Sequence, residues 1–275
     1  MAAVRAVFVD LDDTFLAPDK SIPPENLRMM DALASRGAEL IPCTGRHVGG
    51  VPQAMREHDC VRHVVASNGG IVHDLRSGRD LRVVAIERES VVALYRRLKP
   101  LPVIVDAFAD GYAYSEEVRR HLFDQIDVPE GLRAYLKAGR TFVDMTIEEL
   151  LPRVGPITKL SLFFVGEEGA AAIREGIREI GGMYFVQTSA SNYEVMSTEA
   201  TKGSALLWLA GHEGWLLDEV VAFGDNNNDL TMLDAAGDGV AMANGNDEAK
   251  RHADHIAPPA AEGGVALYLR DAYGI

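Results

Sequence analysis

Two aspartates directly follow the first apolar run of the chain, and their spacing suits paired-acid or metal chemistry. Asp10 and Asp12 come after Ala6-Val-Phe-Val9. Residues two apart on an extended backbone point to the same side, so both carboxylates can face one reacting centre. Two such charges repel each other unless a cation joins them or one keeps its proton. Mg²⁺, a hard ion that prefers oxygen ligands, would remove this repulsion. For this pair of residues taken alone, the alternative is a turn with capping acids.

A second acidic segment follows another apolar run, nearer the C-terminus. Asp225 and Asp229 belong to Phe223-Gly-Asp-Asn-Asn-Asn-Asp229, which comes at the end of Val220-Val-Ala-Phe223. We expect Asp225 at the tip of a strand and Asp229 one turn into the next helix, so that both reach a single cation. An Asn- and Asp-rich turn is the alternative for this segment taken alone.

The segment Thr44-Gly-Arg46 offers groups that suit a phosphate oxygen. It ends the predicted strand Glu39-Leu-Ile-Pro-Cys43, and a helix with Val48, Val51 and Met55 on one side is expected to follow it. A hydroxyl together with the first amide N–H groups of a helix is a common way to hold such an oxygen. A simple threonine N-cap is the alternative.

Lys202 stands in Ala200-Thr-Lys-Gly203, at the start of a predicted helix. The helix dipole favours anions at that end, so a cation there is unexpected. Its position indicates that it neutralises something, either the carboxylates or a substrate phosphate. An exposed, solvated lysine is the alternative for an isolated lysine.

The elements that must position these residues follow an alternating pattern. Fully apolar runs, typical of strands buried on both faces, recur near both ends of the chain and are separated by segments of helical spacing. This order predicts an α/β fold, a doubly wound (Rossmann-like) parallel sheet with right-handed crossovers. Ligands of such a sheet lie beyond the carboxyl ends of the strands, where these polar clusters fall. The predicted strands are Ala6–Val9, Glu39–Cys43, His63–Ala66, Val220–Phe223 and Gly239–Met242.

The middle of the chain has a different pattern. Several strand-like segments occur between about 81 and 190, with few helices between them. We expect an α+β insertion with its own antiparallel sheet at residues 81–190. The catalytic core then comprises residues 1–80 and 191–275.

Composition limits the class of protein. The 275 residues are 47% hydrophobic and 25% charged, as in ordinary globular chains, and the formal net charge is −14. That charge disfavours nucleic acid and anionic membrane as partners. Two cysteines exclude a disulfide framework or a Cys-rich zinc module. No apolar stretch approaches the roughly 20 residues that span a bilayer, so we expect a cytoplasmic protein.

Taken together, the polar segments resemble the four motifs of the haloacid dehalogenase (HAD) superfamily of phosphatases, in the same order. The insertion is similar to the C2-type cap of the Cof-like sugar-phosphate phosphatases, and the resemblance spans nearly the whole chain. Two residues depart from the family pattern: Asp13 replaces a common glycine, and Cys43 replaces a frequent alanine. The matching segments are Asp10-Leu-Asp-Asp-Thr14, Thr44-Gly-Arg46, Lys202 and Gly224-Asp-Asn-Asn-Asn-Asp229, with Ser67-Asn-Gly-Gly70 and Val240-Ala-Met-Ala-Asn244 similar to the subgroup.

The resemblance implies a hydrolase that acts on a small phosphorylated metabolite. Asp10 would be the nucleophile that forms an aspartyl-phosphate. Asp12 would be the general acid for the leaving group and then the base for water, and the acid role requires a raised pKa.

The resemblance also implies how the cofactor and the phosphate are held. Mg²⁺ would be bound by the Asp10 carboxylate, the Asp12 backbone carbonyl and Asp225. Asn228 and Asp229 would support it. The phosphoryl oxygens would be bound by Thr44, Gly45 and Lys202.

Two other functions stay open on sequence alone. One is a sugar phosphomutase on the same core, which returns the phosphoryl group to substrate. The other is a receiver-like signalling module phosphorylated on aspartate, although such modules place the accepting aspartate after the third strand, where this chain has Ser67-Asn68. His252 and His255 have a metal-ligand spacing, but we expect surface residues. The substrate and the oligomeric state cannot be inferred from the sequence.

Overall fold

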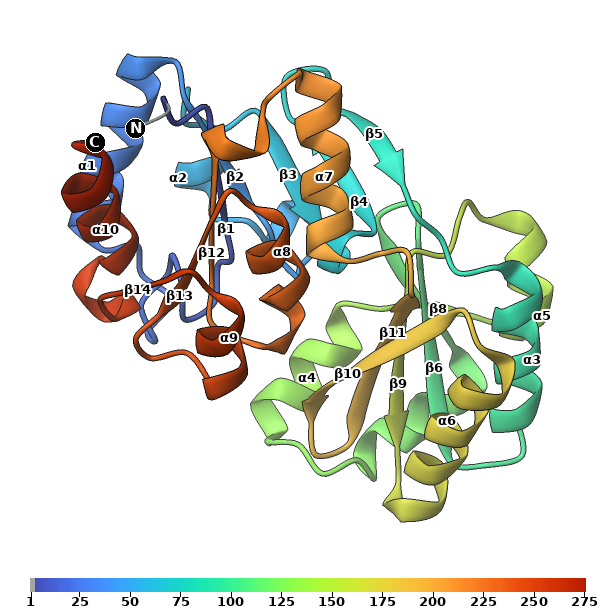
Figure 1. Ribbon diagram of the computed structural model, residues 1–275. Helices are drawn as coiled ribbons and strands as arrows, with labels where there is room; N and C mark the ends of the chain where they lie inside the picture. Colours follow the sequence, from blue (N-terminus) through green and yellow to red (C-terminus); the bar gives the residue numbers. More distant parts are fainter. Residues whose placement is uncertain (1–2) are drawn as a thin grey trace. The chain divides into compact units, whose positions relative to one another are not determined.

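The computed structural model describes residues 3–275 and divides into two compact units. The first contains the described residues up to Arg82 together with Ala200–Ile275, and the second contains Val83–Glu199 (Figure 1). Within residues 3–275, no helix is long and apolar enough to cross a membrane. The two units are described separately below.

The first unit is built on a five-stranded parallel sheet, which confirms the predicted α/β core. The strand order is β14-β13-β12-β1-β2, and Val9 at the end of β1 lies opposite Phe223 of β12 and Pro42 of β2. The carboxyl ends of these three strands therefore lie at one edge of the sheet. The strands are β1 (Ala6–Val9), β2 (Glu39–Pro42), β12 (Val220–Gly224), β13 (Asp238–Met242) and β14 (His255–Ala257).

Helices cover both faces of this sheet (Figure 1). Val7 and Val9 of β1 pack in the cluster formed with α1 and α10, whereas Ala6 and Phe8 pack in the cluster formed with α7 and α8. Burial of the Val7, Phe8 and Val9 side chains contributes roughly 1.5–3 kcal/mol each, so the alternation of β1 fixes both layers. The helices are α1 (Pro24–Arg36), α7 (Lys202–Glu213), α8 (Leu230–Ala235), α9 (Asp247–His252) and α10 (Gly264–Tyr273).

A small antiparallel sheet extends this unit. The predicted third strand belongs to it rather than to the main parallel sheet, and its link to β2 is a bridge between Cys43 and Val65. The pattern did not predict its second strand. The three strands are β3 (His63–Ala66), β4 (Ile71–Asp74) and β5 (Arg79–Val83).

The prediction of a single helix after Arg46 is wrong. The chain forms a 3₁₀ turn over Val48–Gly50 and then a short helix, α2 (Gln53–Arg56), separated by an extended Val51. Pro52 causes the break, because it lacks an N–H group and disfavours a helical conformation in the residue before it.

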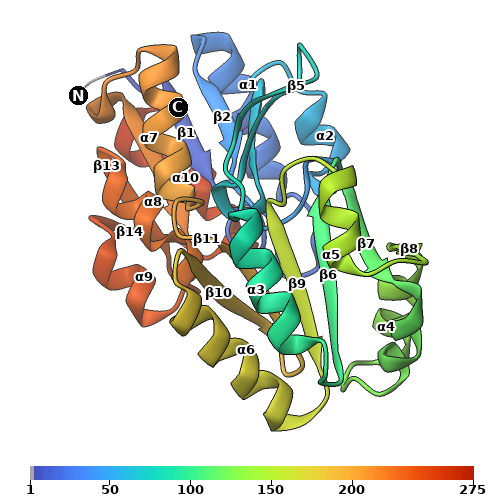
Figure 2. The same ribbon diagram turned by 90° about the vertical axis from the view of Figure 1, so that its right-hand side faces the viewer.

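The second unit is an α+β layer with a six-stranded sheet of order β10-β11-β9-β6-β7-β8. Helices α3 and α6 pack side by side on one face (Figure 2). The unit extends to Glu199, past the predicted end at residue 190, because β11 pairs with β9 and β10. Its elements are α3 (Arg88–Leu98), β6 (Val103–Ala109), β7 (Tyr112–Glu116), α4 (Glu130–Ala138), β8 (Thr141–Val143), α5 (Ile147–Leu150), β9 (Lys159–Phe164), α6 (Gly166–Ile180), β10 (Met183–Ser189) and β11 (Asn192–Ser197).

Candidate active site

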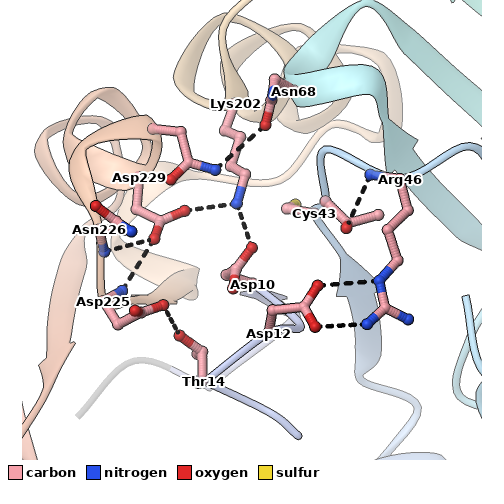
Figure 3. A network of polar contacts seen from close by, with 12 residues as sticks. Asp10, Asp12, Thr14, Cys43, Arg46, Asn68, Lys202, Asp225, Asn226 and Asp229 are labelled. Carbon is pink, nitrogen blue, oxygen red and sulfur yellow. Dashed lines mark hydrogen bonds and ion pairs between the residues drawn. The ribbon is translucent and has the colours of Figure 1, made fainter. Parts of the chain in front are cut away.

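The ends of β1 and β12 bring three carboxylates together (Figure 3). Asp10 follows β1, and its N–H donates to the Phe223 carbonyl of β12 at 3.0 Å. Asp225 follows β12, and Asp229 lies one turn further on. One carboxylate oxygen from each of Asp10, Asp225 and Asp229 lies within 4.8 Å of the other two.

Lys202 lies at the centre of this acidic cluster rather than in solvent. Its side chain is fully buried, and Nζ donates to Asp10 Oδ1 at 2.5 Å and to Asp229 Oδ1 at 2.6 Å. A buried ammonium is tolerated only where it is paired and hydrogen-bonded. Although burial opposes it, the two acids raise the pKa of Lys202 above its usual value. The exposed-lysine alternative is therefore wrong.

Asp229 positions the loop that follows β12. Its Oδ2 accepts the backbone N–H groups of Asp225 at 2.9 Å and of Asn226 at 3.0 Å, while Oδ1 accepts Lys202. Gly224 allows this approach, because a Cβ there would lie 2.4 Å from the Cβ of Asp229. Both carboxylate oxygens of Asp229 thus have partners within the protein. This suits a residue that supports a metal site rather than one that binds the metal ion directly.

The cluster carries more negative charge than the chain neutralises. Burial raises the pKa of Asp10 to about 8, with Lys202 opposing and the Asp229 and Asp225 carboxylates adding to the rise. Burial and Asp229 likewise raise the pKa of Asp225 to about 6, against the hydrogen bond from Thr14 at 2.8 Å. Three carboxylates around one ammonium leave an excess of negative charge if all are ionised. Because all the donors are hard oxygens, they fit a divalent cation such as Mg²⁺.

Asp12 points to Arg46 and not to this cluster (Figure 3). The Arg46 guanidinium donates through Nε to Oδ2 at 2.9 Å and through Nη2 to Oδ1 at 2.5 Å, and Lys20 Nζ lies 3.0 Å from Oδ1. Partial burial raises the pKa of Asp12, but the hydrogen bonds and charges of Arg46 and Lys20 outweigh it and hold the pKa below its usual value. The raised pKa expected from the sequence is therefore wrong for this arrangement, in which Asp12 is a carboxylate.

Thr44 lies in a turn between β2 and the 3₁₀ segment. Its buried hydroxyl accepts the Arg46 N–H at 3.1 Å, and its own N–H donates to the Val65 carbonyl at 2.9 Å. No helix starts here in the described part of the chain, so neither the early-helix amides nor the N-cap alternative applies. The hydroxyl hydrogen of Thr44 remains the group that suits a phosphoryl oxygen.

Asp13, which departs from the family pattern, has a left-handed backbone with φ of 63°. This region favours glycine, and aspartate and asparagine are the other residues that enter it most readily. Its carbonyl accepts Asn244 Nδ2 at 2.7 Å, which fixes the turn. The substitution of glycine by aspartate is therefore compatible with the turn.

This conformation predicts a difference between two substitutions at the same position. Asp13→Ala should lower the free energy of unfolding by about 1 kcal/mol relative to Asp13→Gly, because alanine has neither glycine's freedom nor a short polar side chain. Urea unfolding of the two variants measures the difference. Equal stabilities would contradict the strained turn.

The two histidines of the C-terminal segment do not share a site. His252 Nδ1 pairs with Asp234 at 2.8 Å, and His255 Nδ1 pairs with Asp238 at 3.0 Å. Each is a local contact between a histidine and an aspartate at or near the surface, which agrees with the expected surface role.

Comparison with known proteins decides the family. The model of the haloacid dehalogenase-like hydrolases matches residues 7–269. The chain belongs to this family. It is 27% identical to phosphatase YwpJ of Bacillus subtilis, over 97% of this chain and 99% of the relative. It is 24% identical to pyridoxal phosphate phosphatase YbhA of Escherichia coli, over 92% of each.

Solved structures share the fold of this haloacid dehalogenase-like hydrolase. BT1666 from Bacteroides thetaiotaomicron, a phosphatase of the superfamily, superimposes with a TM-score of 0.80 at 20% identity, covering 98% of this chain and 95% of the other. The family expected from the motifs is confirmed, and the chain is a hydrolase whose relatives are named phosphatases.

Several residues of the hydrolase's site were not singled out by sequence reasoning. Arg46 and Lys20 bind Asp12, Thr14 binds Asp225, and Asn68 contacts Asn228. Arg46, Thr14 and Asn68 stand inside the motifs already quoted, so their positions in those motifs could have identified them as site residues. Lys20 lies outside these motifs, and no sequence pattern pointed to it.

Proposed function

We propose that the protein is a Mg²⁺-dependent phosphatase that hydrolyses a small phosphate monoester, such as a sugar phosphate, through an aspartyl-phosphate on Asp10. The observation that carries this proposal is the buried contact of Lys202 with Asp10 and Asp229, beside Asp225. A carboxylate that attacks a phosphate dianion meets repulsion, and this arrangement supplies a cation at the nucleophile.

The reaction consists of two displacements at phosphorus. Asp10 attacks, an O–P bond forms, and the bond to the ester oxygen breaks while that oxygen takes a proton from Asp12. Asp12, now a carboxylate, accepts a proton from water, whose oxygen then attacks phosphorus and releases phosphate and the Asp10 carboxylate. The covalent intermediate divides one difficult displacement into two easier ones.

The remaining residues hold the phosphoryl group and the cofactor. The Lys202 ammonium, the Thr44 hydroxyl and the Gly45 backbone would bind the phosphoryl oxygens and offset their charge. Mg²⁺ would be held by the Asp10 carboxylate, the Asp12 carbonyl and Asp225, with Asn228 and Asp229 in support. When bound, it supplies positive charge that stabilises the phosphoryl oxygens.

Arg46 sets a condition on the first step. Because its guanidinium holds the Asp12 carboxylate in the ionised form, the bidentate contact must open before Asp12 can donate a proton. We propose that Arg46 and Lys20 hold Asp12 as the carboxylate in the free enzyme. The proton that Asp12 takes from water in the second displacement is then released to solvent when this contact re-forms, and Asp12 takes up a proton from solvent when the contact opens for the next turnover.

A panel of phosphate monoesters with Mg²⁺, assayed for free phosphate, tests the proposal. We expect release that is lost with EDTA and restored by Mg²⁺. A small phosphorylated metabolite is the expected partner, in line with relatives such as pyridoxal phosphate phosphatase YbhA. Absence of release from every ester would contradict the proposal. Transfer of phosphate between positions of a sugar phosphate without release would indicate a mutase instead.

Asp12→Ala should reveal the general acid through the leaving group. We expect kcat/KM, which reports the first displacement, to fall roughly 10²–10⁴-fold on alkyl phosphates, whose oxygen needs a proton, and much less on aryl phosphates such as p-nitrophenyl phosphate. A plot of log kcat/KM against leaving-group pKa should be steeper for the variant than for the wild type. Equal losses on alkyl and aryl esters would contradict the acid role.

A further inference from the structure

A strained turn lies next to the site and has no role in the reaction described above. Ser67, Asn68 and Gly69 are three consecutive residues with left-handed φ values of 50°, 54° and 101°. A serine rarely adopts this conformation, and three consecutive residues in it persist only where surrounding contacts enforce it, although asparagine enters the region more readily than most residues. The contacts of the turn therefore indicate what it serves.

One side of the turn binds the Thr44–Arg46 segment. The Ser67 N–H donates to the Arg46 carbonyl and the Asn68 N–H donates to the Thr44 carbonyl, each at 3.0 Å. The buried Asn68 amide also lies against Gly45, because a Cβ at Gly45 would be 3.1 Å from Asn68 Oδ1. The turn thus fixes the backbone of the proposed phosphate loop.

The other side binds the segment that carries Lys202. A Cβ at Gly69 would lie 2.1 Å from the Thr201 carbonyl oxygen and 2.9 Å from the Lys202 backbone nitrogen, so glycine is required there. Arg82 Nη1 donates to the Gly69 carbonyl at 3.4 Å. The start of α7 and the turn are therefore packed backbone against backbone.

The Asn68 side chain adds a third connection. Its Oδ1 accepts Asn228 Nδ2 at 3.2 Å, and Asn228 belongs to the segment that follows β12. Asn68 therefore touches the phosphate loop and the loop of Asp225, and its neighbour Gly69 touches the start of α7.

We propose that Asn68 is a positioning residue that holds the Thr44–Gly45 turn at a fixed spacing from Asn228 and Lys202, and so sets the width of the phosphate pocket. The inference rests on the phosphatase function proposed above. Within the described part of the chain, Asn68 forms no hydrogen bond or ion pair with Asp10, Asp225 or Asp229, and it reaches the proposed metal site only through Asn228. Its loss should therefore weaken phosphate binding more than Mg²⁺ binding.

The test compares Asn68→Ala and Asn68→Gly with wild type. We expect the Kd for inorganic phosphate, measured calorimetrically with saturating Mg²⁺, to rise about tenfold and kcat/KM to fall at least as much, since displaced groups lose catalytic geometry. The Kd for Mg²⁺ alone should rise by less than the Kd for phosphate. Asn68→Gly relieves the backbone strain, so its Tm should not fall, yet its phosphate affinity should fall as in Asn68→Ala.

Two further variants separate positioning from general stability. Asn26 is a buried asparagine of the same unit that binds the Phe15 carbonyl at 2.9 Å, so Asn26→Ala should lower Tm without changing phosphate affinity. Asn228→Ala should reproduce the loss of Asn68→Ala, and the double variant should lose little more, because both remove the same hydrogen bond.

The inference is overturned if Asn68→Ala lowers Tm but keeps the wild-type Kd for phosphate, or if the double variant shows the sum of both losses. A wild-type protein that releases no phosphate from any ester would contradict the proposed function instead. The phosphate-binding comparison does not depend on turnover, so the two failures are distinguishable.

Discussion

Replacing Asp10 by Asn should reduce phosphatase turnover roughly 10⁴-fold or more, because the amide cannot form the covalent intermediate. The fold should persist, since an amide oxygen can still accept the hydrogen bond from Lys202. Brief reaction with a radiolabelled ester followed by acid quenching should trap label on the wild-type chain and none on the variant. Far-UV circular dichroism and Tm check the fold.

Asp13→Asn is the matched control for this experiment. It makes the same acid-to-amide change three residues further on, at a side chain that is 46% exposed and outside the acidic cluster, and asparagine also tolerates the left-handed backbone. We expect activity close to wild type. Asp10→Ala excludes slow deamidation as a source of residual activity. Radiolabel trapped on the Asp10→Asn variant, or turnover by this variant near the wild-type rate, would refute the assignment of Asp10 as the nucleophile.

Lys202→Met should affect both catalysis and stability. Loss of the ammonium should lower kcat/KM roughly 10²–10³-fold, the usual effect of removing one group that stabilises transition-state charge. In EDTA the free energy of unfolding should fall by roughly 3 kcal/mol, because Asp10 and Asp229 lose the cation that offsets their buried charge. Denaturation with and without Mg²⁺, together with steady-state kinetics, measures both effects.

A second substitution separates the two effects of Lys202. In Lys202→Met/Asp229→Asn, one buried negative charge disappears with the positive one, so part of the stability should return. Activity should not return, since the phosphoryl group still lacks its cation. A double variant that regains activity with stability would show that Lys202 acts only through folding.

The sequence alone predicted four of the five strands of the parallel sheet, the family and a set of candidate reacting groups. Strands buried on both faces leave apolar runs, and the first polar residues after such a run mark its carboxyl end. Asp10 and Asp225 could therefore be placed at the carboxyl ends of two strands from residue types alone, and the structure shows that these two strands are neighbours. Motif order then supplied the family, which the family model confirms over residues 7–269.

Only the tertiary structure decided which partner each charge has. Arg46, 34 positions from Asp12, lowers the pKa that the sequence led us to expect raised. Lys202 binds Asp10, which lies 192 positions away in the sequence. The carboxylate oxygens of Asp229 accept hydrogen bonds from Lys202 and from two backbone amides. Hydrogen bonds and charge interactions depend on separations of a few ångströms and on burial, which periodicity along the chain does not encode.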